Sequence, residues 1–180
     1  MMKLAILGAL GAGLYLATKD DTDPGGAVGV VGSDWAHDTP GAPVTGQAPR
    51  GLRNNNPGNL ENNGIRWQGL ANRQTDSRFY QFTAPLWGIR ALARTLKTYR
   101  DKHGLQTATE IISRWAPAFE NNVGSYARAV ASAVGVDPDS PLPDDESSRV
   151  KLVAAIIKHE NGAQPYPNDL IRDGIREAYL

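Results

Sequence analysis

The sequence predicts a mainly α (α+β) protein in which a helical domain with a small β-containing lobe follows an N-terminal hydrophobic helix. Three observations predict this fold class. Apolar residues recur every three or four positions in several segments after residue 85, which is the period of a helix with one buried face. Turn-forming asparagine, glycine and proline crowd residues 54–64. Near the N-terminus, residues 4–17 contain no charge.

Residues 1–18 are predicted to form a hydrophobic anchor or signal-like helix. Lys3 precedes the apolar run and Asp20 and Asp21 follow it, a charge order that keeps the N-terminus inside and places the bulk of the chain outside. At about 1.5 Å per residue the segment spans roughly 27 Å, which only just crosses a hydrocarbon layer of ~30 Å. We favour a permanent or releasable membrane anchor. A cleaved secretory signal and a helix docked on the main domain are the alternatives.

Residues 19–50 are predicted to be a flexible Gly/Pro-rich linker. Ten of these 32 residues are glycine or proline, and the few apolar residues follow no period. Such a segment cannot bury enough surface to offset the entropy lost on ordering it. The folded domain is therefore expected to comprise residues 51–180.

Within that domain, capping signals delimit the predicted helices. A capping box at Thr107–Glu110 begins one helix, and glycines at 104, 135 and 162 follow the ends of three others. Helices are expected from Leu86 to Gly104, from Thr107 to Pro117, around Tyr126 to Gly135, from about Glu146 to Asn161, and from about Asn168 onward. Short extended pieces are expected around Ile65–Trp67 and Phe79–Phe82, between turns.

Composition excludes several classes of function. Lysine plus arginine equals aspartate plus glutamate, 19 each, so overall charge does not favour nucleic acid as a partner. Residues 51–128 are nevertheless basic, with 11 basic and 5 acidic side chains, which would suit a polyanion or an ordinary solvated face. The absence of cysteine excludes disulfides, thiolate metal sites and a cysteine nucleophile. The three histidines lie far apart in the sequence, so we expect neither a metal nor a cofactor.

The remaining candidates for chemistry are carboxylates, and Glu160 is the first of them. It follows Val153, Ile156 and Ile157 by seven, four and three residues, so it continues the apolar face of its own helix. Partial desolvation and the negative end of the helix both favour the neutral form of a carboxylic acid. A neutral carboxyl is what a general acid needs, although a glutamate at a helix end can also be purely structural. Gly162 lets the chain turn sharply and leaves Glu160 at the edge of a cleft.

Glu61 is the alternative acid or base. It lies among polar turns, where a carboxylate would be solvated and ionised. Amide and aromatic side chains nearby suit a sugar chain, because hydroxyls need donors and acceptors and ring faces stack on aromatics. Building turns and filling the core are the structural alternatives for the same residues. The candidate substrate-binding residues are Asn54, Asn55, Asn56, Asn59, Trp67, Gln68, Tyr80 and Tyr126.

The same residues resemble a family of phage and prophage lysozyme-like proteins. The similarity covers residues 51–166. Its motifs are Arg53-Asn54-Asn55-Asn56-Pro57-Gly58-Asn59, Trp67-Gln68-Gly69-Leu70, residues 79–82, 87–91, 112–117 and 120–122, Tyr126, and His159-Glu160-Asn161-Gly162. The resemblance implies a lysozyme-like, lytic-transglycosylase-like helical fold that acts on peptidoglycan in virion-associated or lysis proteins. In lytic transglycosylases the catalytic glutamate ends a helix, as Glu160 does, but that helix precedes the asparagine-rich segment instead of following it.

The sequence and the resemblance together predict a lytic transglycosylase that cleaves the bond between N-acetylmuramic acid and N-acetylglucosamine, with Glu160 as the acid. The alternatives are a hydrolytic muramidase that uses Glu61 or another acid to activate water, and a non-catalytic wall-binding or virion structural protein. The expected partners are peptidoglycan glycan strands, a membrane through residues 1–18, and other virion proteins. The catalytic domain is expected on the periplasmic or cell-wall side.

Overall fold

The protein is mainly helical, as the sequence predicts. The computed structural model describes residues 48–116 and 123–180, and the predicted anchor and most of the predicted linker lie outside these ranges. The helices are α1 (Arg50–Arg53), α2 (Pro85–His103), α3 (Ala108–Trp115), α4 (Val123–Val134), α5 (Glu146–Asn161) and α6 (Asn168–Tyr179). None of the helices in these ranges is long and apolar enough to cross a membrane.

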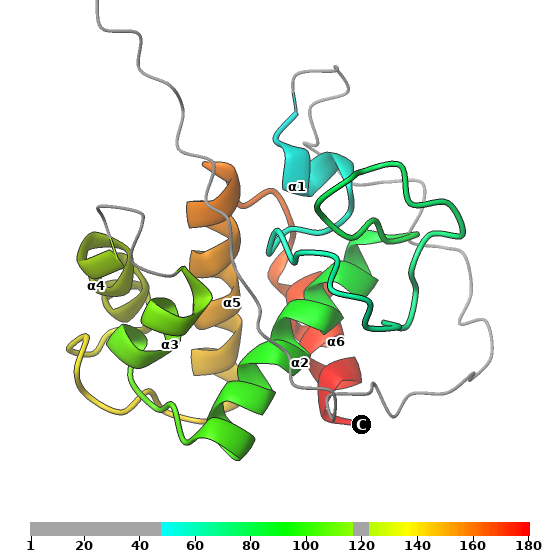
Figure 1. Ribbon diagram of the computed structural model, residues 1–180. Coiled ribbons are helices and arrows are strands. Elements are labelled where there is room, and N and C mark those ends of the chain that lie inside the picture. Colours follow the sequence, from blue (N-terminus) through cyan, green and yellow to red (C-terminus); the bar gives the residue numbers. More distant parts are fainter. Residues whose placement is uncertain (1–47, 117–122) are drawn as a thin grey trace, which may run out of the picture.

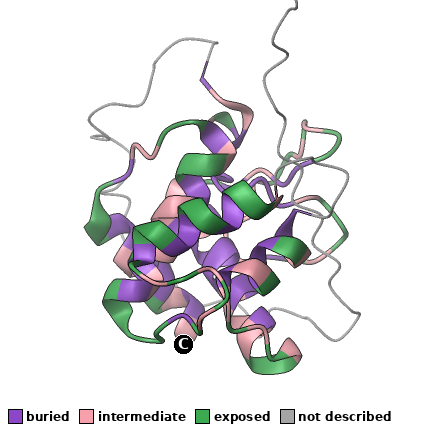
Figure 2. Ribbon diagram, turned by 90° about the vertical axis from the view of Figure 1, so that its left-hand side faces the viewer, coloured by how far each residue is buried: buried purple, intermediate pink, exposed green. Residues whose placement is uncertain are grey.

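The helices form two packed groups that share α5. In Figure 1, α2 and α6 lie side by side, and α4 packs against both α3 and α5. Figure 2 shows the resulting pattern of burial, with exposed residues on the outer faces of the helices. The interior contains the apolar stripes predicted for α2 and α5, and fully buried members include Ile89, Leu92, Ile156 and Ile157. Burial of such stripes is the main stabilising contribution to a helical domain of this size.

The predicted helix boundaries are confirmed because local capping chemistry fixes them. The side chain of Thr107 accepts from the backbone N–H of Glu110, and the Glu110 side chain accepts from the backbone of Thr107, so the capping box is complete. Gly104 and Gly162 follow α2 and α5 with φ of 67° and 70°, the left-handed conformation that favours glycine. The four-residue helix α1 was not predicted.

The lobe between α1 and α2, residues 54–84, contains less β structure than the sequence predicts. It has isolated antiparallel bridges, Glu61 to Phe79 and Leu70 to Phe82, and the extended piece expected around Ile65–Trp67 forms no strand. The physical reason is local. Asn62 and Asn63 accept hydrogen bonds from backbone N–H groups two residues further on, at 3.3 Å each, and these turns compete with strand pairing.

The asparagine-rich turn of the lobe closely approaches the first turn of α2. A Cβ on Gly88 would lie 1.9 Å from the carbonyl oxygen of Asn55, a separation that real atoms do not reach. Only glycine therefore allows the asparagine-rich turn to rest against the first turn of α2. This contact fixes where the turn lies relative to the helical part of the protein.

Candidate functional site

The carboxylate of Glu160 lies where three helices and the asparagine-rich turn meet. Its Oε1 accepts from the indole Nε1 of Trp115 at 3.0 Å and from the hydroxyl of Tyr126 at 3.2 Å. Its Oε2 accepts from Nδ2 of Asn59 at 3.2 Å. Trp115 ends α3, Tyr126 lies in α4, and Glu160 is in the last turn of α5. Four segments that are distant in sequence thus meet at one half-buried carboxyl group.

The three side chains that donate to Glu160 are held in place by buried packing and by backbone conformation. Trp115 is 1% exposed, and its ring meets that of Tyr99 edge-on, with 6.4 Å between centroids. Tyr126 is buried between α4 and α5. Asn59 adopts φ of 50°, a left-handed conformation that asparagine tolerates better than most residues. These constraints place N–H and O–H donors around Glu160 before any ligand arrives.

Asn161, the residue after Glu160, fastens the end of α5 to the turn. Its Nδ2 donates to the carbonyl of Pro57 at 2.7 Å and to that of Ile157 at 2.9 Å. A Cβ on Gly51 would lie 2.4 Å from Oδ1 of Asn161 and 2.7 Å from Oδ1 of Asn59, so α1 also needs glycine at this junction. The position of Glu160 therefore depends on contacts made by its neighbour in sequence.

Glu61, the alternative acid, belongs to a different cluster. Its Oε1 accepts from the guanidinium of Arg78 at 2.7 Å, and that guanidinium lies over the ring of Phe79. This ion pair ties the Glu61 side chain to Arg78 within the lobe. The sequence predicted different surroundings for the two carboxylates, but the partner Arg78 was not predicted.

Asn54, Asn55 and Asn56 stabilise the lobe through hydrogen bonds to other lobe residues. Asn56 is fully buried, and its side chain bonds the backbone of Leu60 in both directions and the carbonyl of Tyr80. Asn55 has φ of 50° and donates to the carbonyl of Phe82 at 3.1 Å. These are the turn-building roles that the sequence offered as the alternative to substrate binding. Asn59 is the member of the asparagine-rich turn with a contact to Glu160.

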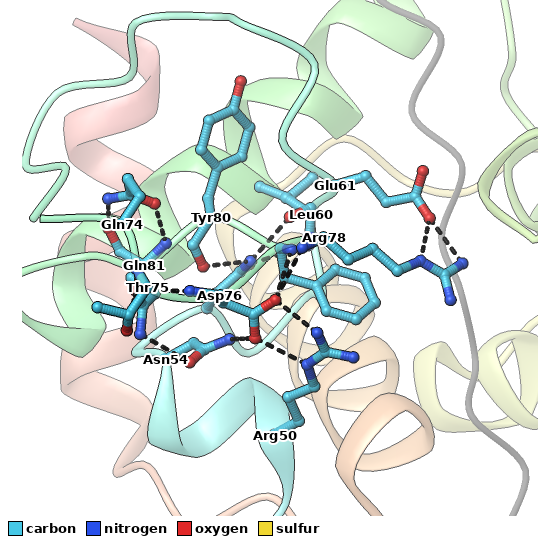
Figure 3. A network of polar contacts seen from close by, with 12 residues as sticks. Arg50, Asn54, Leu60, Glu61, Gln74, Thr75, Asp76, Arg78, Tyr80 and Gln81 are labelled. Atoms are coloured by element: carbon cyan, nitrogen blue, oxygen red, sulfur yellow. Dashed lines mark hydrogen bonds and ion pairs between the residues drawn. The ribbon is translucent and has the colours of Figure 1, made fainter.

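Asp76 is the centre of the polar network of the lobe, which sequence reasoning missed. Figure 3 shows its carboxylate receiving the Arg50 guanidinium at 2.5 and 2.7 Å and Nδ2 of Asn54 at 2.7 Å. The backbone N–H groups of Arg78 and Phe79 add two further donors. The Arg50 guanidinium, followed by these backbone and amide donors, holds the pKa of Asp76 well below its usual range. A lone aspartate among turn residues gave no signal of this role.

The aromatic candidates in the lobe belong largely to the core. Trp67 and Tyr80 are 6% and 2% exposed and pack in the main apolar cluster, so they present no open ring face for a sugar. The Tyr80 hydroxyl donates to Oδ1 of Asn63 at 2.8 Å, and burial raises the pKa of this phenol. Gln68 is half-buried beside Trp67. Of the predicted substrate-binding side chains, Asn59 and Tyr126 are the ones that contact Glu160.

A groove of about 380 Å³ runs between α4 and α5 beside this cluster. Its walls are Ala129, Ala133, Ala155, Lys158, His159 and Gly162. The groove adjoins the carboxylate cluster through His159, whose ring stacks on that of Tyr126, while Glu160 itself does not line it. A second cavity, of about 30 Å³, includes Ser148 near the start of α5, roughly 18 Å along the helix from Glu160. No group of three His, Asp or Glu residues suited to a metal occurs in residues 48–116 and 123–180.

The fold and the site together define a mainly helical protein with one glutamate held at a helix end by indole, phenol and amide donors. No family model matches the chain. Protein P5 of Pseudoalteromonas phage PM2 is 41% identical to it over 131 residues, which cover 71% of this chain and 81% of that phage protein. The chain belongs to the same family as this phage protein.

Proposed function

We propose that this protein is a phage-type enzyme that degrades peptidoglycan by cleaving the bond between N-acetylmuramic acid and N-acetylglucosamine. The observation that carries the proposal is the set of donors around Glu160. A carboxyl group that four chain segments hold in one orientation, next to a groove, is arranged for proton transfer to a bound ligand. The lysozyme-like character of the helical fold is part of this proposal.

The two oxygens of Glu160 have different roles in this mechanism. Oε1 accepts from Trp115 and Tyr126, and Oε2 accepts from Asn59. We assign the exchangeable proton to Oε2, because Oε1 already accepts from two donors. The Trp115 and Tyr126 donors stabilise the carboxylate that remains after the proton has left.

The reaction follows the transglycosylase route. Glu160 protonates the glycosidic oxygen, and the bond from that oxygen to C1 of the muramoyl residue breaks. The 6-hydroxyl of the same residue attacks C1 and returns its proton to Glu160, which closes a 1,6-anhydro ring and restores the acid. No second carboxylate is needed, and the pairing of Glu61 with Arg78 supports a single acid.

Two alternative functions also rest on specific contacts. A hydrolytic muramidase would use Glu61, which pairs with the Arg78 guanidinium, or another acid to activate water. A non-catalytic wall-binding or virion structural protein would use Glu160 as a junction that ties α3, α4 and α5 to the turn. The phage relative is compatible with virion association. Our proposal places the enzyme in a virion or lysis system, anchored through residues 1–18 and facing the cell wall.

Release of soluble fragments from purified peptidoglycan tests the proposal. Glu160→Gln keeps the shape of the side chain, and we expect it to lower the rate at least ~10²-fold while the thermal unfolding midpoint changes little. Glu61→Gln is the matched control and should retain most of the activity. A Glu160→Gln protein with near-normal activity, paired with an inactive Glu61→Gln protein, would transfer the acid role to Glu61. An inactive wild-type protein that still binds peptidoglycan would favour the structural alternative.

A further inference from the structure

The side chains of His159 and Tyr126 lie flat against each other beside the carboxylate cluster. Their ring centroids are 3.4 Å apart, and the ring planes differ by 9°. His159 is on α5 and is exposed, whereas Tyr126 is on α4 and is 3% exposed. The exposed imidazole therefore covers one face of a buried phenol ring.

This stack influences the position of the Tyr126 hydroxyl, which is the group that donates to Glu160. The hydroxyl of Tyr126 donates to Oε1 of Glu160 at 3.2 Å, which is longer than the usual range of about 2.5–3.0 Å for a bond between two oxygens. A phenol hydroxyl extends in the plane of its ring, so the orientation of the ring determines where the hydroxyl lies. The other donor to Oε1 comes from Trp115, whose ring is held deep in the core by Tyr99. For Tyr126, His159 is the aromatic ring that supplies the flat support.

We propose that His159 is a positioning residue that acts through Tyr126, an inference that rests on the proposed function. By fixing the plane of the phenol, the imidazole keeps the Tyr126 hydroxyl on Oε1 of Glu160. In the proposed mechanism Oε2 is the oxygen that exchanges the proton with the substrate. Consecutive residues of α5 thus supply both the acid and the ring that aligns its donor. With the two rings face to face, the flat imidazole sterically limits the tilt of the phenol plane, a constraint that an aliphatic side chain of similar size does not impose.

A double-mutant cycle on the full-length protein tests this coupling. His159→Leu removes the flat ring but retains bulk, and His159→Phe retains the ring. We expect His159→Leu to lower kcat about 3- to 10-fold with KM changed less than about twofold, and His159→Phe to stay within about twofold of wild type. In a Tyr126→Phe background, which has no hydroxyl to align, His159→Leu should have no further effect.

A second readout needs no turnover. The carbon-13 chemical shift of the Glu160 carboxyl carbon should move in the same direction in Tyr126→Phe and in His159→Leu, and stay near wild type in His159→Phe. An equal effect of His159→Leu with and without the Tyr126 hydroxyl would overturn the inference. A His159→Phe protein as slow as His159→Leu would also overturn it. So would a Glu160 carboxyl chemical shift that stays the same in all three variants. A wild-type protein that releases no fragments would instead refute the proposed function, and the chemical shifts would still decide the role of His159.

Discussion

Replacing Asp76 with asparagine should destabilise the lobe more than any other single change of charge there. The substitution preserves shape but removes the charge that Arg50 neutralises and places an amide N–H₂ among donors. Arg50, Asn54 and two backbone N–H groups all donate to this carboxylate, which is 8% exposed. If these hydrogen bonds were lost, few of the donors could bond to water instead.

The size of the effect follows from the exposure of the two partners. Hydrogen bonds to a charged group contribute about 1.5–3 kcal/mol each, and breaking a buried ion pair costs roughly 3–5 kcal/mol. Because the Arg50 side chain is 33% exposed and can rehydrate, we expect the lower end, about 2–3 kcal/mol. For a chain of this size that corresponds to a decrease of about 5–10 °C in the unfolding midpoint.

The effect should also depend on pH. The pKa of Asp76 in the folded protein lies below its unfolded value of about 3.9, because the Arg50 guanidinium stabilises the carboxylate. The contribution of Asp76 is therefore complete above about pH 4 and is lost as pH falls toward the folded-state pKa. Wild type should lose stability on acidification below pH 4, and the Asp76→Asn protein should lose less.

Urea unfolding followed by circular dichroism between pH 2.5 and pH 7 measures both effects. Glu61→Gln is the control, because its partner Arg78 is 44% exposed and an exposed pair contributes less than about 1 kcal/mol. The reasoning would be refuted if Asp76→Asn cost no more than Glu61→Gln at pH 7. It would also be refuted if the two proteins and wild type lost stability in parallel below pH 4.

Two further predictions concern packing. Gly88→Ala should lower the free energy of unfolding in urea by at least about 2 kcal/mol, because its Cβ would overlap the carbonyl of Asn55. In the control Gly124→Ala the Cβ would meet only the end of an arginine side chain at 3.4 Å, so this change should be neutral or stabilising. Equal effects of the two substitutions would contradict the close approach at Gly88. Trp67→Ala should lower stability by about 3–5 kcal/mol, because its indole is 6% exposed in the core. A stable Trp67→Ala protein with weakened glycan binding would instead support the role in the glycan cleft.

The helices were predictable from sequence because local chemistry specifies them. Thr107 and Glu110 begin α3, and Gly104 and Gly162 end α2 and α5, each through contacts within a few residues. The lobe was less predictable. Its fold depends on Asp76 bonding to residues 22 and 26 positions away, and such partners leave no periodic pattern in the sequence.

The same distinction applies to the candidate site. Glu160 was identifiable because its spacing from Ile156 and Ile157 is a local property of one helix. The donors Trp115 and Asn59 lie 45 and 101 positions away, so only the packed structure brings them to the carboxylate. The contacts of Asn161 with Pro57 and Ile157 likewise hold the end of α5, and the partner in Pro57 is 104 positions away.

Mass spectrometry of the fragments that the full-length protein releases from purified peptidoglycan tests the central claim most directly. A single acid at Glu160, with Glu61 held by Arg78, predicts fragments that end in 1,6-anhydromuramoyl residues. These fragments should be absent from digests with Glu160→Gln. Fragments with reducing muramoyl ends, or anhydro ends that persist in Glu160→Gln, would contradict the account.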